Sequence, residues 1–211
     1  MSQEKDFEIY EGLLIKYNGT ETEVKIPDSV VSIYDEAFSG CEGLKRLVIP
    51  EGVTKIGKAA FSRCVNLERV TLPEYMLEIG ADAFLDCRSL TDIRLPQGLI
   101  HIPDGMFLNC AKLNSVEIPD TEQSFSIGRA AFANCTSLEH IALPAGTLVI
   151  EENAFEGCTG LKSVRLPRGL REVRYRAFHN CTSLESMTFF PVRSLREIRA
   201  SLRGKLKNME D

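Results

Sequence analysis

The sequence lacks the features that are typical of membrane proteins and of secreted precursors. No stretch approaches the run of roughly 18 apolar residues that a membrane-spanning helix requires, and the N-terminal segment MSQEKDFEIY is polar and acidic. A secretory signal would need a continuous apolar core at that place. With Met1 as the native start, the sequence therefore predicts a cytoplasmic protein without a transmembrane segment.

Signatures of catalysis and of metal binding are missing as well. The sequence contains no phosphate-binding loop, no nucleophile elbow and no paired-carboxylate motif. Its three histidines, His101, His140 and His179, lie at different positions of the repeat described below and do not converge on one site. We therefore expect no catalytic residue, no metal site and no cofactor, in a protein that is not an enzyme.

Tryptophan is absent, and no segment has a low-complexity composition. Because Trp is one of the residues that anchor tight protein interfaces, the composition does not indicate a strong, dry interface. Hydrophobic residues make up 44% of the chain and charged residues 26%, which predicts a sizeable core and an ordered chain.

One unit is repeated along nearly the whole chain. The strings AFSGCEGLKRLVIP and AFSRCVNLERVTLP begin at Ala37 and Ala60, 23 residues apart. Four residue types recur with this period: Phe38, Phe61, Phe84, Phe107, Phe132, Phe155 and Phe178; Cys41, Cys64, Cys87, Cys110, Cys135, Cys158 and Cys181; Leu44, Leu67, Leu90, Leu113, Leu138, Leu161 and Leu184; and Pro27, Pro50, Pro73, Pro96, Pro119, Pro144, Pro167 and Pro191. A fixed period of this length is typical of a repeat architecture.

Each unit contains one short strand and one turn. The residues before each proline alternate between apolar and polar, as in Leu47-Val48-Ile49, which predicts a strand that ends at the proline. The Ala-Phe-x-x-Cys segment has a spacing of three and four, which predicts one turn of α-helix or 3₁₀-helix. Such a unit cannot bury its apolar face alone, so we expect the units to stack around a continuous core.

The recurring string A-F-x-x-C-x-x-L-x-x-ϕ-x-ϕ-P, where ϕ is apolar, resembles the BspA-type leucine-rich repeat, which occurs in tandem in many bacterial proteins. The resemblance covers about Val24 to Phe190. It implies an α/β repeat solenoid, a right-handed superhelix of short parallel strands and helical turns, curved like part of a horseshoe. It also implies a binding surface, and it makes the cell surface or secretion the alternative to the cytoplasm.

The two ends of the solenoid need caps. Glu11-Gly12 and Asn18-Gly19 are turn signals between apolar runs, which predicts an N-terminal β-hairpin cap over residues 1–26. After Pro191, Ser194 and Glu197 form a capping box. Apolar residues then recur at helical spacing, which predicts an amphipathic capping helix over residues 193–211 after a solenoid domain of residues 1–192.

The seven cysteines all belong to the repeat. Equivalent thiols on stacked strands would lie about 4.8 Å apart and point in parallel, which does not suit a disulfide. A one-dimensional stack gives each thiol two neighbours, whereas zinc needs four ligands in a tetrahedron. A redox, metal-binding or catalytic role is the less favoured alternative, and we expect a structural column of buried thiols.

Two places depart from the repeat. Between Pro119 and Ile127 the segment DTEQSFSI has two extra residues. Insertions into repeats form surface loops that often lie on a functional face, although a tolerated bulge is the simpler explanation. In the fourth repeat Pro103 and Met106 stand where other repeats have Gly and Ala, which predicts a local bend.

The water-facing strand positions form two rows, and the resemblance makes this concave strand face the default surface for a protein partner. We therefore predict a non-catalytic protein-interaction scaffold. The candidate partner-binding residues on this face are Arg46, Arg69, Asp92, Arg94, Glu117, His140 and Arg165.

The alternative is an anionic partner at the C-terminal end. Residues 161–208 contain 12 basic and three acidic residues, although the whole chain has a net charge of −5. A region of one sign attracts an oppositely charged partner, here a nucleic acid, an acidic protein or an anionic membrane surface. The candidate residues are Arg165, Arg168, Arg171, Arg174, Arg176, Arg196, Arg199 and Arg203. The sequence does not indicate the oligomeric state.

Overall fold

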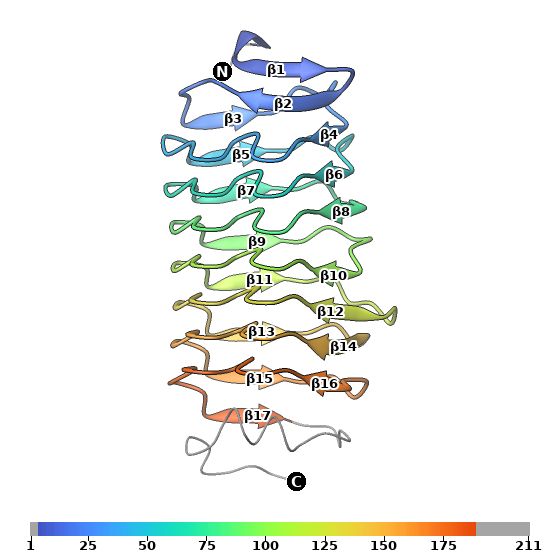
Figure 1. Ribbon diagram of the computed structural model, residues 1–211, viewed down its shortest axis with the longest axis vertical. Helices are drawn as coiled ribbons and strands as arrows, with labels where there is room; N and C mark the ends of the chain where they lie inside the picture. The colour runs from blue at the N-terminus through green and yellow to red at the C-terminus, as the bar shows by residue number, and fades with distance from the viewer. Residues whose placement is uncertain (1–3, 189–211) are drawn as a thin grey trace.

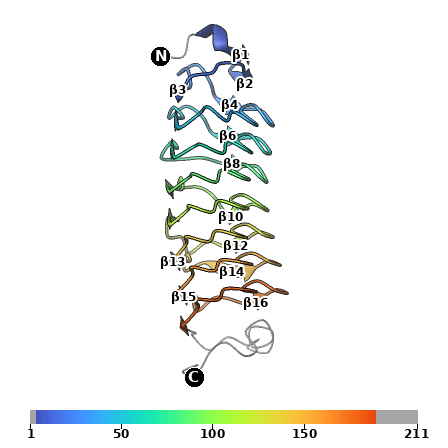
Figure 2. The same ribbon diagram turned by 90° about the vertical axis from the view of Figure 1, so that its left-hand side faces the viewer.

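The computed structural model describes residues 4–188 of the chain. The predicted C-terminal helix over residues 193–211 lies outside the described residues, as do Arg196, Arg199 and Arg203. The described chain forms one stack of about eight coils with its ends at opposite ends of the column (Figure 1). The expected horseshoe curvature is not evident, because the column is nearly straight in both side views (Figures 1 and 2).

The predicted strand of each repeat is present. These strands are β3 (Glu23–Lys25), β5 (Arg46–Val48), β7 (Arg69–Thr71), β9 (Asp92–Arg94), β11 (Ser115–Glu117), β13 (His140–Ala142), β15 (Ser163–Arg165) and β17 (Ser186–Thr188). They form two parallel sheets, β11-β9-β7-β5-β3 and β13-β15-β17. In each strand whose three side chains are described, the middle residue is buried and the outer two point away from the core, as the alternation predicts.

Each coil also contains a second short strand, which the sequence did not indicate. These strands are β4 (Ser32–Ile33), β6 (Lys55–Ile56), β8 (Glu78–Ile79), β10 (His101–Ile102), β12 (Phe125–Ile127), β14 (Thr147–Ile150) and β16 (Glu172–Val173). They stack beside the first row (Figure 1) in the sheets β1-β2-β4-β6-β8 and β10-β12-β14-β16. Most of them are two residues long, which is too short to produce an alternating pattern.

The prediction of one helical turn per repeat is wrong. Within residues 4–188 the only helical element is the 3₁₀ turn η1 (Glu4–Asp6). The residue two places before each column phenylalanine and the residue two places after it have positive φ, as Glu36 and Gly40 do around Phe38 (56° and 75°). A helix cannot continue through such residues. Their amides instead bond to the next coil, as in Glu36 N–H to Lys58 O (2.9 Å) and Gly40 N–H to Ser62 O (2.8 Å).

The core consists of columns that run along the stack. The ring centroids of successive column phenylalanines are 5.1–5.7 Å apart. Beside them, six of the seven cysteines are buried and Cys41 is half-buried, and all seven are free thiols. Each buried thiol donates a hydrogen bond to the phenylalanine carbonyl of the preceding coil, from Cys64 to Phe38 O (3.1 Å) through Cys181 to Phe155 O (3.1 Å). The predicted structural column of thiols is therefore confirmed.

The predicted N-terminal hairpin is confirmed. It consists of β1 (Phe7–Tyr10) and β2 (Leu13–Tyr17), which pair antiparallel. Its turn is Glu11-Gly12, where both residues have positive φ (46° and 79°), a conformation that Gly adopts without steric cost. Phe7 and Tyr17 extend the phenylalanine column, with ring centroids 5.1 Å apart and Tyr17 4.9 Å from Phe38, so the hairpin covers the end of the core.

Asn18-Gly19 is not a hairpin turn. It connects β2 to β3, and these two strands belong to different sheets. The dipeptide therefore carries the chain from the cap into the first row of strands.

Both rows of strands are interrupted near the irregular repeats. The second row breaks between β8 and β10, and the first row between β11 and β13. Gly57 and Gly80 each donate a backbone hydrogen bond to the preceding coil, at Ile33 O and Ile56 O (both 2.8 Å). Pro103 occupies the same place but has no N–H to donate, which explains the first interruption. The second lies beside the two-residue insertion.

Candidate functional site

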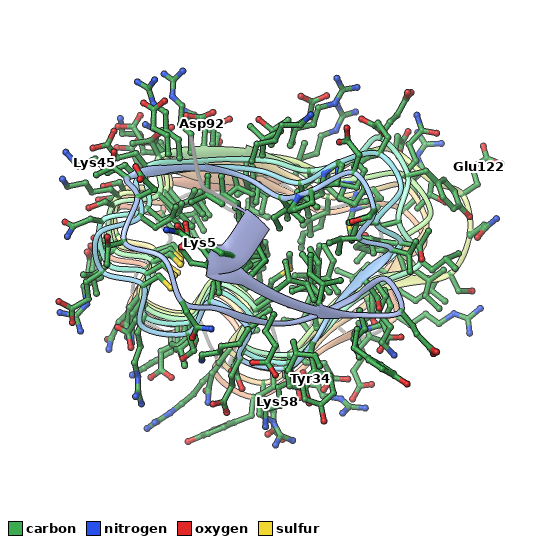
Figure 3. The ribbon with its side chains drawn as sticks, turned by 90° about the horizontal axis from the view of Figure 1, so that it is seen from above. Lys5, Tyr34, Lys45, Lys58, Asp92 and Glu122 are labelled. Carbon is green, nitrogen blue, oxygen red and sulfur yellow. The ribbon has the colours of Figure 1, made fainter. Side chains whose placement is uncertain are left out.

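The outward side chains of the first row of strands form the surface that we call the strand face. Glu23, Arg46, Arg69, Asp92 and Ser115 lie in register across β3 to β11, and His140, Ser163 and Ser186 continue the row across β13 to β17. The break between β11 and β13 divides this row, so His140 and Arg165 belong to a different hydrogen-bonded sheet from Arg46, Arg69 and Asp92. Figure 3, viewed along the stack, shows Asp92 projecting from one side and Lys58 and Tyr34 from the opposite side.

Several strand-face charges are paired with one another. Arg46 lies 3.3 Å from Glu23 and Arg94 lies 3.4 Å from Glu117, in both cases across neighbouring strands. His140 Nδ1 is 2.9 Å from Ser163 Oγ. Within residues 4–188, Arg69 and Arg165 are exposed and form no ion pair, so their guanidinium groups present unneutralised charge on this face.

The described arginines of the predicted basic region are spread around one coil. Arg165 lies in β15 on the strand face, Arg168 follows it at the edge of the coil, and Arg171 precedes β16. Arg174 follows β16 and is bound by two carboxylates, Glu151 at 2.7 Å and Glu172 at 3.1 Å. The hydrogen bond with Glu172, followed by the charges of Glu151 and Glu172, raises the pKa of Arg174.

Arg176 lies in the turn after β16, where its guanidinium carbon is 5.2 Å from the centroid of the Tyr175 ring. The five arginines therefore point in several directions, and Arg174 contributes little net positive charge to the surface.

The histidines do not form a site. His101 lies in β10, His140 in β13 and His179 in the turn after Phe178. Among the described residues, no three His, Cys, Asp or Glu side chains are grouped in a way that could hold a metal ion. In the same part of the chain, no helix has both the length and the hydropathy of a membrane span.

Two cavities that were not predicted from the sequence lie on the edge that connects the two rows of strands. Ile118 and Asp120, at the start of the insertion, line both of them. The first has a volume of about 480 Å³, and its other lining residues include Tyr75, Gln97 and Phe125. Figure 3 shows Glu122, two residues after Asp120, projecting from this edge of the molecule.

The second cavity, which we call the Ala142 cavity, has a volume of about 540 Å³. Its lining includes Ala142, Ala145, Leu166, Arg165 and Arg168. Two features of the sequence are related to this cavity. One is the insertion, and the other is the pair of small residues, Ala142 and Ala145, at outward positions of one repeat. The alanines indicate a hollow only when the side chains of the neighbouring coils are known.

Comparison with known proteins agrees with this architecture. A family model described as the BspA type leucine rich repeat region, six copies, matches residues 16–126 and 125–202. No curated protein matches the chain.

Solved structures of bacterial leucine-rich repeat proteins are similar to the chain. A T. pallidum leucine rich repeat protein is 28% identical, with 90% of this chain and 82% of that one covered and a TM-score of 0.60. A leucine-rich repeat protein from Bacteroides ovatus ATCC 8483 is 27% identical, with 92% and 56% covered and a TM-score of 0.72. A leucine rich cell surface protein from Faecalibacterium prausnitzii A2-165 shares the fold at 24% identity, with 84% and 72% covered and a TM-score of 0.52. Proteins built from these repeats are typically non-enzymatic scaffolds for protein interaction.

Proposed function

Because the chain belongs to the BspA-type leucine-rich repeat family, we propose that it is a non-catalytic scaffold that binds a protein partner on the strand face. The observation that carries this proposal is the register of Arg46, Arg69 and Asp92 on three neighbouring strands. The inward residues of these strands are buried apolar residues that maintain the stack, whereas the outward residues differ from coil to coil. The strand face therefore presents a partner with a fixed pattern of charges, separated by the spacing of the strands, about 4.8 Å.

The charge pattern supports specificity more than raw affinity. Along β3 to β9 the outward row has the order acid, base, base, acid, from Glu23 through Arg46 and Arg69 to Asp92. Like charges side by side, such as Arg46 and Arg69, are unfavourable in the free protein. A partner carboxylate placed between them would relieve this repulsion, and complementary charge at an interface discriminates among partners.

The test uses the immobilised full chain and compares what it captures with what two variants capture. The first variant, Arg46→Ser, Arg69→Ser, Asp92→Ser, removes two basic groups and one acidic group from the strand face. The matched control, Lys55→Ser, Lys58→Ser, Glu78→Ser, removes the same charges near the second row. Each set also breaks one ion pair, Arg46–Glu23 or Lys55–Glu78 (2.8 Å). Proteins are recovered from a cell lysate and from an extracellular-matrix mixture.

We expect a discrete protein that the unmodified chain and the control retain and that the strand-face variant loses. Retention by both variants would place the partner elsewhere. The extracellular-matrix mixture is included because the F. prausnitzii protein of similar fold is a cell surface protein. We propose the cell surface as the alternative to the cytoplasm.

The alternative function is an anionic partner bound through residues 161–208. Arg165, Arg168 and Arg171 follow one another around the edge of a coil, which supports this alternative, whereas the ion pairs of Arg174 with Glu151 and Glu172 do not. Repeating the capture at roughly 50 and 300 mM salt separates the two functions, because binding of phosphate polyanions falls steeply with salt. Nucleic acid that is captured only at low salt, and lost after Arg165→Ser, Arg168→Ser, Arg171→Ser, would favour the alternative.

A further inference from the structure

The Ala142 cavity lies where β13 and β15 end, at the border between the strand face and the edge of the stack. Its volume of about 540 Å³ falls within the range of roughly 300–1,000 Å³ that is typical of ligand sites. Leu143, Pro144, Leu166 and Pro167 contribute aliphatic lining. The cavity therefore combines an apolar floor with an opening to solvent beside charged residues.

The cavity exists because one coil has small side chains at two outward positions. Ala142 pairs in register with Arg165 of the next coil, and Ala145 occupies the repeat position of Arg168 and Asp120. Alanine leaves room at both places, where the neighbouring coils have larger, charged side chains. Both alanines are exposed, so this room is open to solvent and is not part of the core.

The walls of the cavity carry opposite charges. On one wall, Asp120 Oδ1 accepts a hydrogen bond from Ala145 N–H (2.8 Å), which fixes the position of this carboxylate. On the other wall stand Arg165 and Arg168. A ligand anion is therefore attracted to the arginine wall and repelled by the Asp120 wall, so the charges orient a bound ligand in the cavity.

Arg165 differs in its contacts from other described bases of the same region. Lys162 forms an ion pair with Glu139 (2.6 Å), and Arg174 forms one with Glu151 (2.7 Å). Arg165 forms no ion pair within residues 4–188 and is exposed at the cavity. Guanidinium groups bind carboxylates through two parallel hydrogen bonds, so Arg165 is suited to bind a carboxylate that enters the cavity.

We propose that the Ala142 cavity binds a segment of a protein partner in which a carboxylate side chain flanks a large apolar side chain. This inference rests on the proposed function and names the chemistry of the partner. The apolar side chain lies over Ala142 and Ala145, and the carboxylate faces Arg165 and Arg168. Burial of one large side chain in a pocket, surrounded by contacts that exclude water, is the usual arrangement of an interface anchor.

Other anionic partners fit this site less well. Grooves for single-stranded nucleic acid combine basic residues with aromatic side chains on which bases stack, and no aromatic residue lines the Ala142 cavity. The neighbouring 480 Å³ cavity has aromatic residues, Tyr75 and Phe125, but neither Lys nor Arg in its lining. Aromatic lining and positive charge are thus on separate sides of the insertion, which favours a peptide over a nucleic acid.

The test measures binding of three fluorescein-labelled peptides to the full chain by fluorescence polarisation. The probe has Glu-Phe-Glu at the centre of a Gly/Ser peptide, and the two controls have Glu-Ala-Glu and Lys-Phe-Lys. The first variant, Ala142→Leu, fills the cavity and leaves every charge in place. Its matched control is Val48→Leu, an exposed residue at the same repeat position in β5. The second variant, Arg165→Ser, Arg168→Ser, removes the cations.

We expect the Glu-Phe-Glu peptide to bind, and both controls to bind at least about tenfold more weakly. Ala142→Leu and the arginine variant should each weaken binding by about tenfold or more, and Val48→Leu should not change it. Equal binding of the Lys-Phe-Lys peptide, an unchanged affinity for Ala142→Leu, or no binding up to about 1 mM would each overturn the proposal. The strand-face capture experiment is unaffected by these results, because its variants retain the cavity.

Discussion

Each buried cysteine connects two coils through its side chain. Its thiol donates to the phenylalanine carbonyl of the preceding coil, at 3.2 Å in the case of Cys110 and Phe84. A small, weakly polar group suits this place because it fills the apolar column and also satisfies a backbone oxygen. Burial raises the pKa of Cys87, Cys110 and Cys135, so these thiols stay protonated in the folded protein.

The raised thiol pKa values predict a loss of stability in alkali. In the unfolded chain a cysteine ionises near pH 8.5, whereas the buried thiols do not ionise there. The unfolded state therefore releases protons that the folded state retains, and stability that is fully present below about pH 8.5 falls as pH rises above it. Urea unfolding between pH 7 and 10 should show the free energy of unfolding decreasing by up to about 1.4 kcal/mol per pH unit for each buried thiol.

The variant Cys135→Ala provides the control for this prediction. Above pH 8.5 the free energy of unfolding of this variant should fall less steeply with pH, because one thiol fewer ionises on unfolding. The lost packing should lower the free energy of unfolding at pH 7 by about 1–2 kcal/mol. A slope that is the same in the variant and in the parent would contradict the assignment of the pH dependence to the thiols.

At the scale of the element, the turn around each phenylalanine is an alternating right- and left-handed segment. Three of its amides bond to the next coil, as Ala130, Phe132 and Asn134 do at 3.0, 2.8 and 2.7 Å. Non-glycine residues occupy most of the left-handed places, including Ala59 and Ala130, both at φ 51°. An L-residue in this conformation costs roughly 1–2 kcal/mol, and the bonds between coils offset this cost.

Ala130→Gly should therefore stabilise the protein. Glycine relieves the left-handed strain of Ala130, and part of the gain is lost because glycine makes the unfolded chain more flexible. We expect the free energy of unfolding to rise by about 0.5–1 kcal/mol in urea denaturation. Ala81→Gly is the matched control: Ala81 has no positive φ, so only the loss of chain entropy remains and stability should fall. Destabilisation by both substitutions would show that the left-handed places carry no strain.

At the scale of the whole molecule, the stack is nearly one-dimensional, since each strand in the two rows pairs only with equivalent strands of nearby coils or, in the case of β4, with the N-terminal hairpin. Stability in such proteins is approximately a sum of the contributions of the coils and of the contacts between neighbours. The phenylalanine column is one such set of contacts, with Phe61 and Phe84 separated by 5.3 Å between ring centroids.

Double-mutant cycles along this column should show coupling between neighbours only. Phe61→Leu, Phe84→Leu and Phe155→Leu should each cost about 1–2 kcal/mol. The adjacent pair at positions 61 and 84 should show a coupling energy of about 0.5–1.5 kcal/mol, and the distant pair at 61 and 155 should be additive within about 0.5 kcal/mol. Equal coupling in the two pairs would contradict a nearest-neighbour stack.

The candidate surfaces also depend on the whole molecule. The sequence correctly placed Arg46, Arg69 and Asp92 on one row, because period-2 alternation and the 23-residue repeat together fix which side of the sheet a residue occupies. It grouped Arg165 and Arg174 as one basic region, whereas the structure places them on different sides of a coil and pairs Arg174 with Glu151. Residues that are close in sequence can lie on different sides of a coil, so the sequence alone does not show which of them share a surface.

What the sequence by itself determined is what depends on local pattern and on period. The Phe and Cys columns, the first row of strands and the N-terminal hairpin follow from spacing, alternation and the Glu11-Gly12 turn, each of which is readable within a few residues. The second row of strands, the left-handed turns and the Ala142 cavity were decided only by the tertiary structure. Each of these depends on which group of the neighbouring coil a backbone amide or a side chain meets. That partner is distant in the sequence, as Lys58 is from Glu36, and it leaves no local pattern in the chain.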